Sequence, residues 1–93
     1  MYKRQLLARR SGEEALTELR RLAATSPDPL IATFTSLLVA QLCENAGRTA
    51  EALAAVSRAR RLAERNGFAW FRLVATMTTA QLHSQRALSL IQI

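Results

Sequence analysis

Helix-breaking residues divide this chain into four segments. Apart from Gly12, they fall in three stretches: "SPDP" (26–29), "NAG" (45–47) and "NG" (66–67). Asp28 is a good N-cap and Pro29 a good first helical residue, because the cap's carboxylate accepts from N–H groups that lack a partner in the helix. Gly47 and Gly67 can each take the left-handed conformation that ends a helix. These stretches predict breaks in a chain that is otherwise free to be helical.

Between the breaks, apolar residues recur every three or four positions, which is the spacing of one face of an α-helix. The expected helices are 12–24, with an extension toward Leu6 and Leu7, then about 29–46, 49–65, and 68 into the eighties. The stripes expected to face the core are Ala15, Leu16, Leu19, Leu22 and Ala23; Leu30, Ile31, Phe34, Leu37, Leu38, Gln41 and Leu42; Ala52, Leu53, Val56, Ala59, Leu62 and Ala63; and Trp70, Phe71, Val74, Met77 and Leu82. The short loops favour antiparallel neighbours.

Length and composition agree with an all-α chain. Ninety-three residues make one small domain, nearly half of them hydrophobic, with only three Gly and two Pro. Thr33, Thr35 and Ser36 interrupt the longest apolar run, which is too short to span a membrane. No signal peptide is recognisable, and a single Cys allows no internal disulfide. We therefore expect a cytoplasmic protein with no membrane partner.

Two pairs of segments match each other, which indicates an internal repeat. "LIATFTSLLVAQL" (30–42) aligns with "WFRLVATMTTAQL" (70–82) at an offset of 40, and "EEAL" (13–16) aligns with "AEAL" (50–53) at an offset of 37. The first and third expected helices are therefore one kind of element, and the second and fourth another. The chain holds the second helix of one unit, a complete unit, and the first helix of the next.

The stretch "GRTAEALAAVSRARRLAERNG" (47–67) resembles a tetratricopeptide-type repeat, although the offsets exceed the usual period of about 34 residues. The residues that define the repeat are Gly47, Ala52, Leu53, Val56, Ala59, Gly67 and Trp70. The resemblance implies an all-α fold in which antiparallel helix pairs stack as a right-handed solenoid, here a fragment of about four helices. Trp70 and Phe71 would then pack on the preceding repeat, or one would be exposed where the next repeat is missing.

Residues 11–84 are similar to divergent repeats near the C-terminus of large bacterial signalling proteins. The matching features are the "G-R-x-x-E-A-L" turn at 47–53, the "A-x-R-x-G" helix end at 63–67 and the aromatic Trp70. Such repeats occur in MalT-like and LuxR-type transcriptional regulators and in ATPase-linked adenylate cyclases. The resemblance implies a repeat array that senses an inducer or partner and relays it to a nucleotide-binding switch module.

The two ends resemble translated sequencing-adapter DNA. The mosaic-end sequence of transposase-based libraries reads Val-Tyr-Lys-Arg-Gln in one frame, and its GTG codon can be read as a start Met, which gives "MYKRQ" (1–5). Its reverse complement reads Leu-Ser-Leu-Ile-His-Ile, which differs from "LSLIQI" (88–93) only at Gln92. We therefore expect 6–87 to be a helical-repeat fragment of metagenomic origin, flanked by non-native tails at 1–5 and 88–93.

No residue pattern points to catalysis, a metal or a cofactor. His83 is the only His and is expected on the surface. Cys43 has no His or second Cys within a helical turn and is expected to be a buried or half-buried structural thiol. The sequence holds no Gly-rich phosphate loop, zinc-ligand spacing or nucleophile elbow. We expect no enzyme and no cofactor.

The net charge of +6 comes almost entirely from Arg. Arg58, Arg61 and Arg65 share one face of the third expected helix, where they could contact phosphate or an acidic partner. The alternative, which we favour, is the solvated back of an amphipathic helix, because no aromatic residue is interleaved with these arginines.

These observations favour protein–protein interaction or regulatory scaffolding within a larger bacterial signalling ATPase or transcriptional regulator. The expected partner is a protein, a peptide or neighbouring repeats of the same parent chain, and nucleic acid is not expected. The helices 29–46 and 68 onward would supply most of the binding surface. The alternative is a free-standing, small basic helical protein that binds nucleic acid or an acidic partner.

Overall fold

The computed structural model describes the backbone of residues 2–91 and the side chains of residues 12–88. Its described part contains no strand and consists of four helices: α1 (Tyr2–Thr25), α2 (Pro29–Asn45), α3 (Thr49–Asn66) and α4 (Ala69–Ile91). The all-α class, the four helices and the positions of all three breaks are confirmed. None of these helices is both long enough and apolar enough to cross a membrane.

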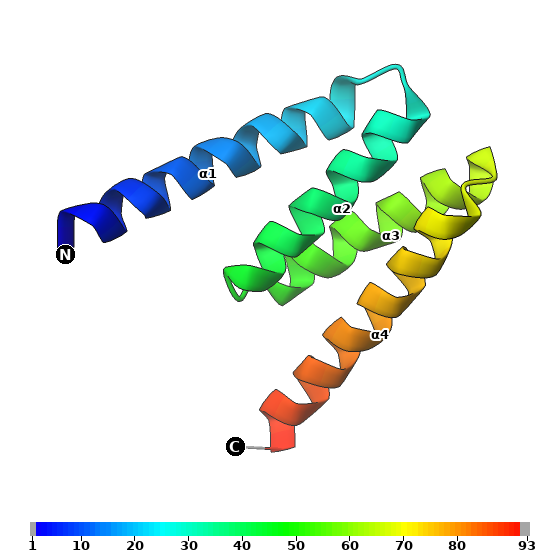
Figure 1. Cartoon of the computed structure of the whole chain (residues 1–93). Helices are drawn as coiled ribbons and strands as arrows, with labels where there is room; N and C mark the ends of the chain where they lie inside the picture. The colour runs from blue at the N-terminus through cyan, green and yellow to red at the C-terminus, as the bar shows by residue number, and fades with distance from the viewer. Residues whose placement is uncertain (1, 92–93) are drawn as a thin grey trace.

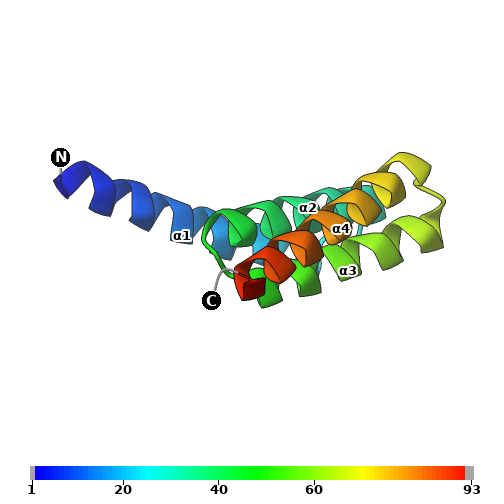
Figure 2. The same cartoon turned by 90° about the horizontal axis from the view of Figure 1, so that it is seen from below.

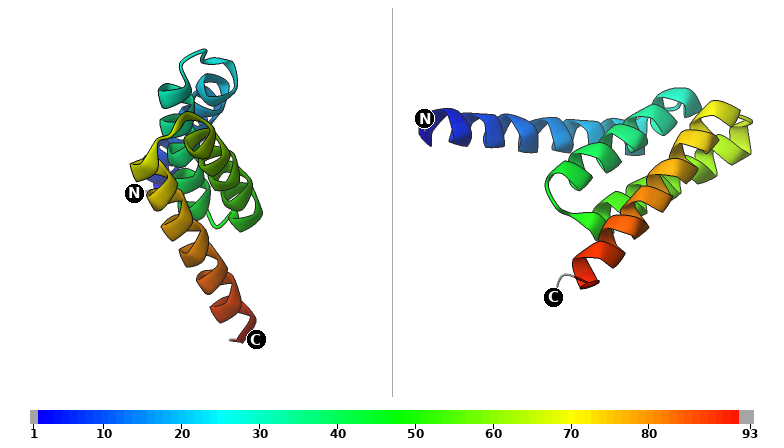
Figure 3. Two further views of the ribbon diagram at one scale, coloured as in Figure 1. Left: turned by 90° about the vertical axis from the view of Figure 1, so that its right-hand side faces the viewer. Right: turned by 60° about the horizontal axis from the view of Figure 1, so that its bottom comes forward.

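Each helix runs back along the one before it (Figure 1). The most extensive contact is between α2 and α3, whereas α1 packs on α2, α4 packs on α3, and α2 meets α4 only lightly. The helices form a flat body, with extents of 45 × 34 × 17 Å, and the N-terminal part of α1 extends beyond the other helices (Figures 2 and 3). A thickness of 17 Å leaves room for no more than two layers of helices.

The first helix is longer than the sequence indicates. It begins at Tyr2 and continues through Gly12, where we expected an extension only to about Leu6. Helical backbone also covers 88–91. Residues 1 and 92–93, and the side chains of 2–11 and 89–91, lie outside the described part, so the non-native origin of the two tails stays a prediction.

The helix ends have the geometry that the sequence predicts. Asp28 caps α2, and its carboxylate accepts a hydrogen bond from the backbone N–H two residues on, at 2.9 Å. Gly47 and Gly67 lie in the left-handed region, with φ of 76° and 70°. Beyond Gly67, the Phe68 N–H donates to the Ala63 carbonyl at 2.9 Å, which closes the last turn of α3.

The core lies where α3 packs between α2 and α4. The stripe predicted for α3 is confirmed, because Ala52, Val56, Ala59 and Ala63 are all at most 1% exposed. The buried cluster that joins the four helices is Leu16, Val39, Ala40, Cys43, Ala52, Val56, Ala75 and Leu82. Most of these side chains are small, so the helices approach one another closely.

The predicted core face of α2 is mostly wrong, since only Leu37 and Leu42 of that stripe are half-buried and pack against the core. Its large apolar residues Leu30, Ile31, Phe34 and Leu38 are 36–49% exposed, and the opposite side of the helix is buried instead. The buried side consists of Ala32, Thr33, Thr35, Ser36, Val39, Ala40 and Cys43. Burying the hydroxyls costs little because each donates to a backbone carbonyl of its own helix. Small side chains also let α2 pack between α1 and α3.

The predicted core face of α4 is partly wrong. Leu82 is fully buried, together with Ala75, but Trp70 is 67% and Met77 64% exposed. Phe71 is half-buried. The physical reason is that α4 packs mainly on α3, which covers one narrow side of the helix.

Candidate interaction surface

Large apolar side chains that are exposed or half-buried lie along the first half of α2 and at the start of α4. We call them the α2–α4 face: Leu30, Ile31, Phe34, Leu38, Trp70 and Phe71. The Phe34 ring meets the Phe71 ring edge to face at a centroid distance of 6.3 Å, and Phe71 meets Trp70 at 5.1 Å. These aromatic contacts connect the two helices across their outer side. Isolated exposed apolar residues are ordinary, but a connected group of them is typical of interaction sites.

The two helices contribute matching positions to this face. At the offset of 40, Leu30 corresponds to Trp70 and Ile31 to Phe71. Leu30 is 45% and Trp70 67% exposed, so the corresponding position is open to solvent in both helices. The apolar pattern that predicted a core stripe on these two helices therefore marks an exposed surface that is repeated in α2 and α4.

A group of polar contacts connects α1 with α3 around the buried thiol of Cys43. The Arg20 guanidinium donates to a carboxylate oxygen of Glu51 at 2.7 Å and lies 3.5 Å from the Cys43 sulfur. The hydrogen bond from Arg20 lowers the pKa of Glu51, and the same contact raises the pKa of Arg20. Arg48 adds an ion pair to Glu13 of α1 at 2.8 Å. These contacts hold the helices together.

Cys43 and His83 were the two residues considered for metal or catalytic chemistry. Cys43 is fully buried, as expected, and His83 is exposed, as expected. Within the described part of the chain, no three His, Cys, Asp or Glu residues lie close enough together to hold a metal ion.

The predicted basic face exists as a cluster. Arg58, Arg61 and Arg65 line one shallow depression on the outer side of α3. Arg58 already has a partner within the chain. Its guanidinium donates a hydrogen bond to the Ala23 carbonyl at 2.7 Å and so connects α3 to α1.

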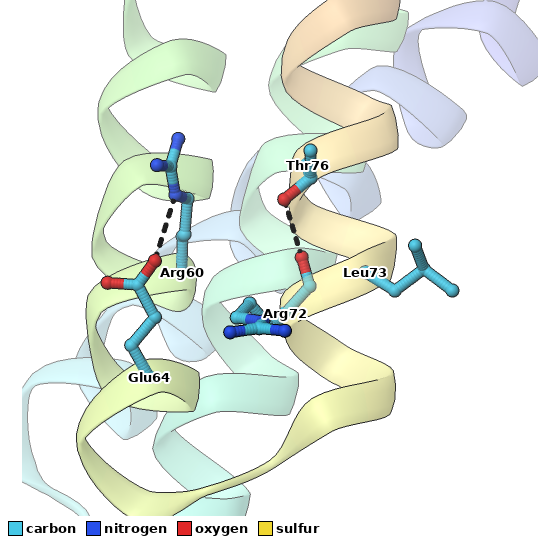
Figure 4. A pocket seen from close by; sticks show the side chains of 5 residues that line it. All are labelled: Arg60, Glu64, Arg72, Leu73 and Thr76. Carbon is cyan, nitrogen blue, oxygen red and sulfur yellow. Dashed lines mark hydrogen bonds and ion pairs between the residues drawn. The ribbon is translucent and has the colours of Figure 1, made fainter.

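A groove runs between α3 and α4 (Figure 4). Arg60 and Glu64 of α3 lie on one side and form an ion pair at 3.2 Å. Arg72, Leu73 and Thr76 of α4 lie on the other, and the Thr76 hydroxyl donates to the Arg72 carbonyl at 2.9 Å. This groove was not anticipated from the sequence, because it depends on how the two helices pack.

The residues predicted to define the repeat do not form one site. Gly47 and Gly67 end helices, and Trp70 belongs to the α2–α4 face. The others lie along α3: Ala52, Val56 and Ala59, which are fully buried, and Leu53, which is half-buried. Comparisons of the chain with known protein families, with curated proteins and with solved structures find no match.

Proposed function

We propose that this chain is a protein-interaction segment that binds its partner through the α2–α4 face. The observation that supports it is the exposed, connected apolar group that begins α2 and α4, with Phe34 and Phe71 in edge-to-face contact at 6.3 Å. The partner that fits such a surface is a protein or peptide with an apolar side of its own, such as an amphipathic helix. Trp70 is the natural anchor, because exposed Trp residues are over-represented among binding hot spots.

The finer architecture belongs to the same proposal. The four helices are two kinds of element, repeated at offsets of 37 and 40, and they stack as right-handed tetratricopeptide-like pairs. In the family that the repeat resembles, such arrays serve as regulatory scaffolds within bacterial signalling ATPases and transcriptional regulators. The proposed role here is the same, in which the array presents a surface to a partner or to neighbouring repeats of a parent chain.

Selection of helical peptides from a display library on the immobilised chain tests the proposal. Peptides with one apolar side should be enriched, and Trp70→Ala should weaken their binding by about 2 kcal/mol, roughly thirtyfold in Kd. Because Trp70 is 67% exposed, we expect the same change to alter the free energy of unfolding by less than about 1 kcal/mol. Fluorescence anisotropy of a labelled peptide measures the Kd.

Leu88→Ala is the matched control, since Leu88 is also apolar, is 56% exposed and lies on α4, but about five turns beyond Trp70 and away from the α2–α4 face. We expect it to leave the peptide affinity unchanged. Equal losses in Trp70→Ala and Leu88→Ala, or enrichment of no apolar peptide, would refute the proposal.

The arginine cluster supports a second candidate function, binding of nucleic acid or an acidic partner. Arg58, Arg61 and Arg65 line one depression in a chain of net charge +6. If it acts in this way, binding to a DNA or RNA duplex should weaken steeply as salt rises, and Arg61→Glu should weaken it further. Absence of binding at low salt would remove this candidate.

A further inference from the structure

One side of α4 is open where the matching side of α2 is covered. At the offset of 40, Leu73 corresponds to Thr33, which is fully buried against its neighbours, yet Leu73 is 58% exposed. The same holds for a set of five positions. Buried Ala32, Thr33, Ser36, Ala40 and Cys43 of α2 correspond to exposed Arg72, Leu73, Thr76, Ala80 and His83 of α4. We call these five α4 residues the open side of α4.

One side of α1 is also exposed, although the matching side of α3 is buried. At the offset of 37, Ala15 corresponds to Ala52, and Leu22 to Ala59, and both α3 residues are fully buried. In α1, Ala15 is exposed and Leu22 is half-buried. The reason is that α3 packs against both α2 and α4, whereas α1 packs against α2 and meets α3 only through polar side-chain contacts. Ala15, Glu18 and Leu22 form what we call the open side of α1.

We propose that the chain associates head to tail with a second copy of itself. The open side of α1 in one copy packs on the open side of α4 in the next. This pairing would reproduce between two chains the α2–α3 contact, which is the most extensive within one chain. Among the described helices, no α3-type helix packs on the open side of α4, and no α2-type helix packs on the open side of α1.

Opposite charges also meet at the edge of the proposed contact, where Glu18, paired with Arg21 in the single chain, would approach Arg60, paired with Glu64. Within one chain, Ala55 of α3 lines a groove together with Ala23 of α1 and Ser36 of α2. The matching residues across the proposed contact are Glu18 of one copy and Arg60 and Thr76 of the other, by offsets of 37 and 40. The register therefore places a carboxylate against a guanidinium.

A second pair follows from the same register. Within one chain, a carboxylate oxygen of Glu51 lies 3.9 Å from the Cys43 sulfur. The corresponding residues across the contact are Glu14 of one copy and His83 of the other. Both are exposed in the single chain, so each is available for a partner.

The contact uses two different surfaces, so it leaves one open side free at each end of a pair. Such heterologous contacts add copies without closing, unless the geometry happens to form a ring. The predicted product is a concentration-dependent series of oligomers, not a dimer alone. The α2–α4 face lies outside this contact and stays available, so the two proposals can fail separately.

Sedimentation velocity of the full chain, from micromolar to millimolar concentration at low salt, tests the self-association. The weight-average mass should rise with concentration. Glu18→Arg alone and Arg60→Glu alone should each weaken association about tenfold or more, because each sets like charges opposite each other. An equimolar mixture of the two variants should associate again, since every contact in it can pair opposite charges.

Arg61→Glu is the matched control, because it makes the same charge change one residue further along α3, on the arginine cluster, whose depression is lined by α3 residues and not by α4. It should leave association unchanged. Circular dichroism checks that all variants keep their helices, as expected for exposed positions. A monomer at every concentration would overturn the proposal, and so would association that both charge reversals leave intact.

Discussion

Glu51 is the residue at which the polar contacts between the helices converge. One of its carboxylate oxygens accepts from Arg20 of α1 at 2.7 Å and lies 3.9 Å from Arg48, one turn earlier on the chain. The same oxygen lies 3.9 Å from the Cys43 sulfur of α2. The pattern of apolar residues gave no sign of this role, because the partners of Glu51 are far apart in sequence.

The contact with Arg20 predicts how stability depends on pH. Because the pKa of Glu51 is lower in the folded chain than in the unfolded one, this contribution is fully present above the unfolded value, near pH 4.3. It is lost as pH falls through the lower folded pKa. Urea unfolding at neutral and acid pH should therefore show a larger loss of stability for the wild type than for Glu51→Gln. If the wild type and Glu51→Gln lost the same amount of stability in acid, the contact would be contradicted. Glu44→Gln is the control variant.

Ser36 shows why polarity misled the assignment of the α2 surface. It is only 2% exposed, and its hydroxyl donates to the Ala32 carbonyl at 2.7 Å. That carbonyl also accepts its backbone hydrogen bond within the helix, so the hydroxyl adds little to stability. What this position requires is a small side chain.

Two substitutions at Ser36 separate size from polarity. Ser36→Ala should change the free energy of unfolding by less than about 1 kcal/mol, since it removes only the local hydroxyl bond. Ser36→Leu should destabilise by about 1–3 kcal/mol, because a larger side chain must force α2 from its neighbours. Chemical denaturation measures both. If the leucine variant were as stable as the wild type, Ser36 would have to face solvent.

At the scale of the helix, the sequence was enough to place every element but not every buried side. Asp28, Gly47 and Gly67 act through the local backbone, so their effect could be read directly from the chain. The burial of α3 could also be predicted, since its apolar stripe is narrow and faces both neighbours. The burial of α2 could not, because its buried side carries three hydroxyl side chains, whereas its large apolar side chains lie on the exposed side. The small residues that recur along one side of the helix, Ala32, Thr33, Ser36 and Ala40, were the available signal.

Two glycines should respond oppositely to the same substitution. Gly67→Ala should cost about 1–2 kcal/mol, because Gly67 has φ of 70° and an added Cβ would meet no other atoms within 4 Å, so the cost is purely conformational. Gly12→Ala should stabilise by about 0.5–1 kcal/mol, since Gly12 lies inside α1 with open space around it. Thermal unfolding of both variants tests this; shifts of the same sign would contradict the helix boundaries.

At the scale of the whole molecule, the four helices have two open sides and one exposed apolar face. The repeat in the sequence predicted which helices correspond to each other. It did not predict which surfaces stay exposed, because exposure depends on how the helices pack. Helix packing also produces the groove between α3 and α4 and the exposure of the α2–α4 face. The candidate site was therefore present in the sequence as a stripe of large apolar residues that had been assigned to the core.

Trp70 permits the most direct test of the central claim, because it is the only Trp in the chain and lies on the proposed binding face. The measurement is its fluorescence emission and its quenching by acrylamide, with and without a peptide selected for binding. We expect long-wavelength emission and easy quenching in the free chain. On binding, the emission should shift to shorter wavelength and the quenching should fall. A Trp70 already shielded in the free monomer, or one unchanged by a bound peptide, would contradict the account.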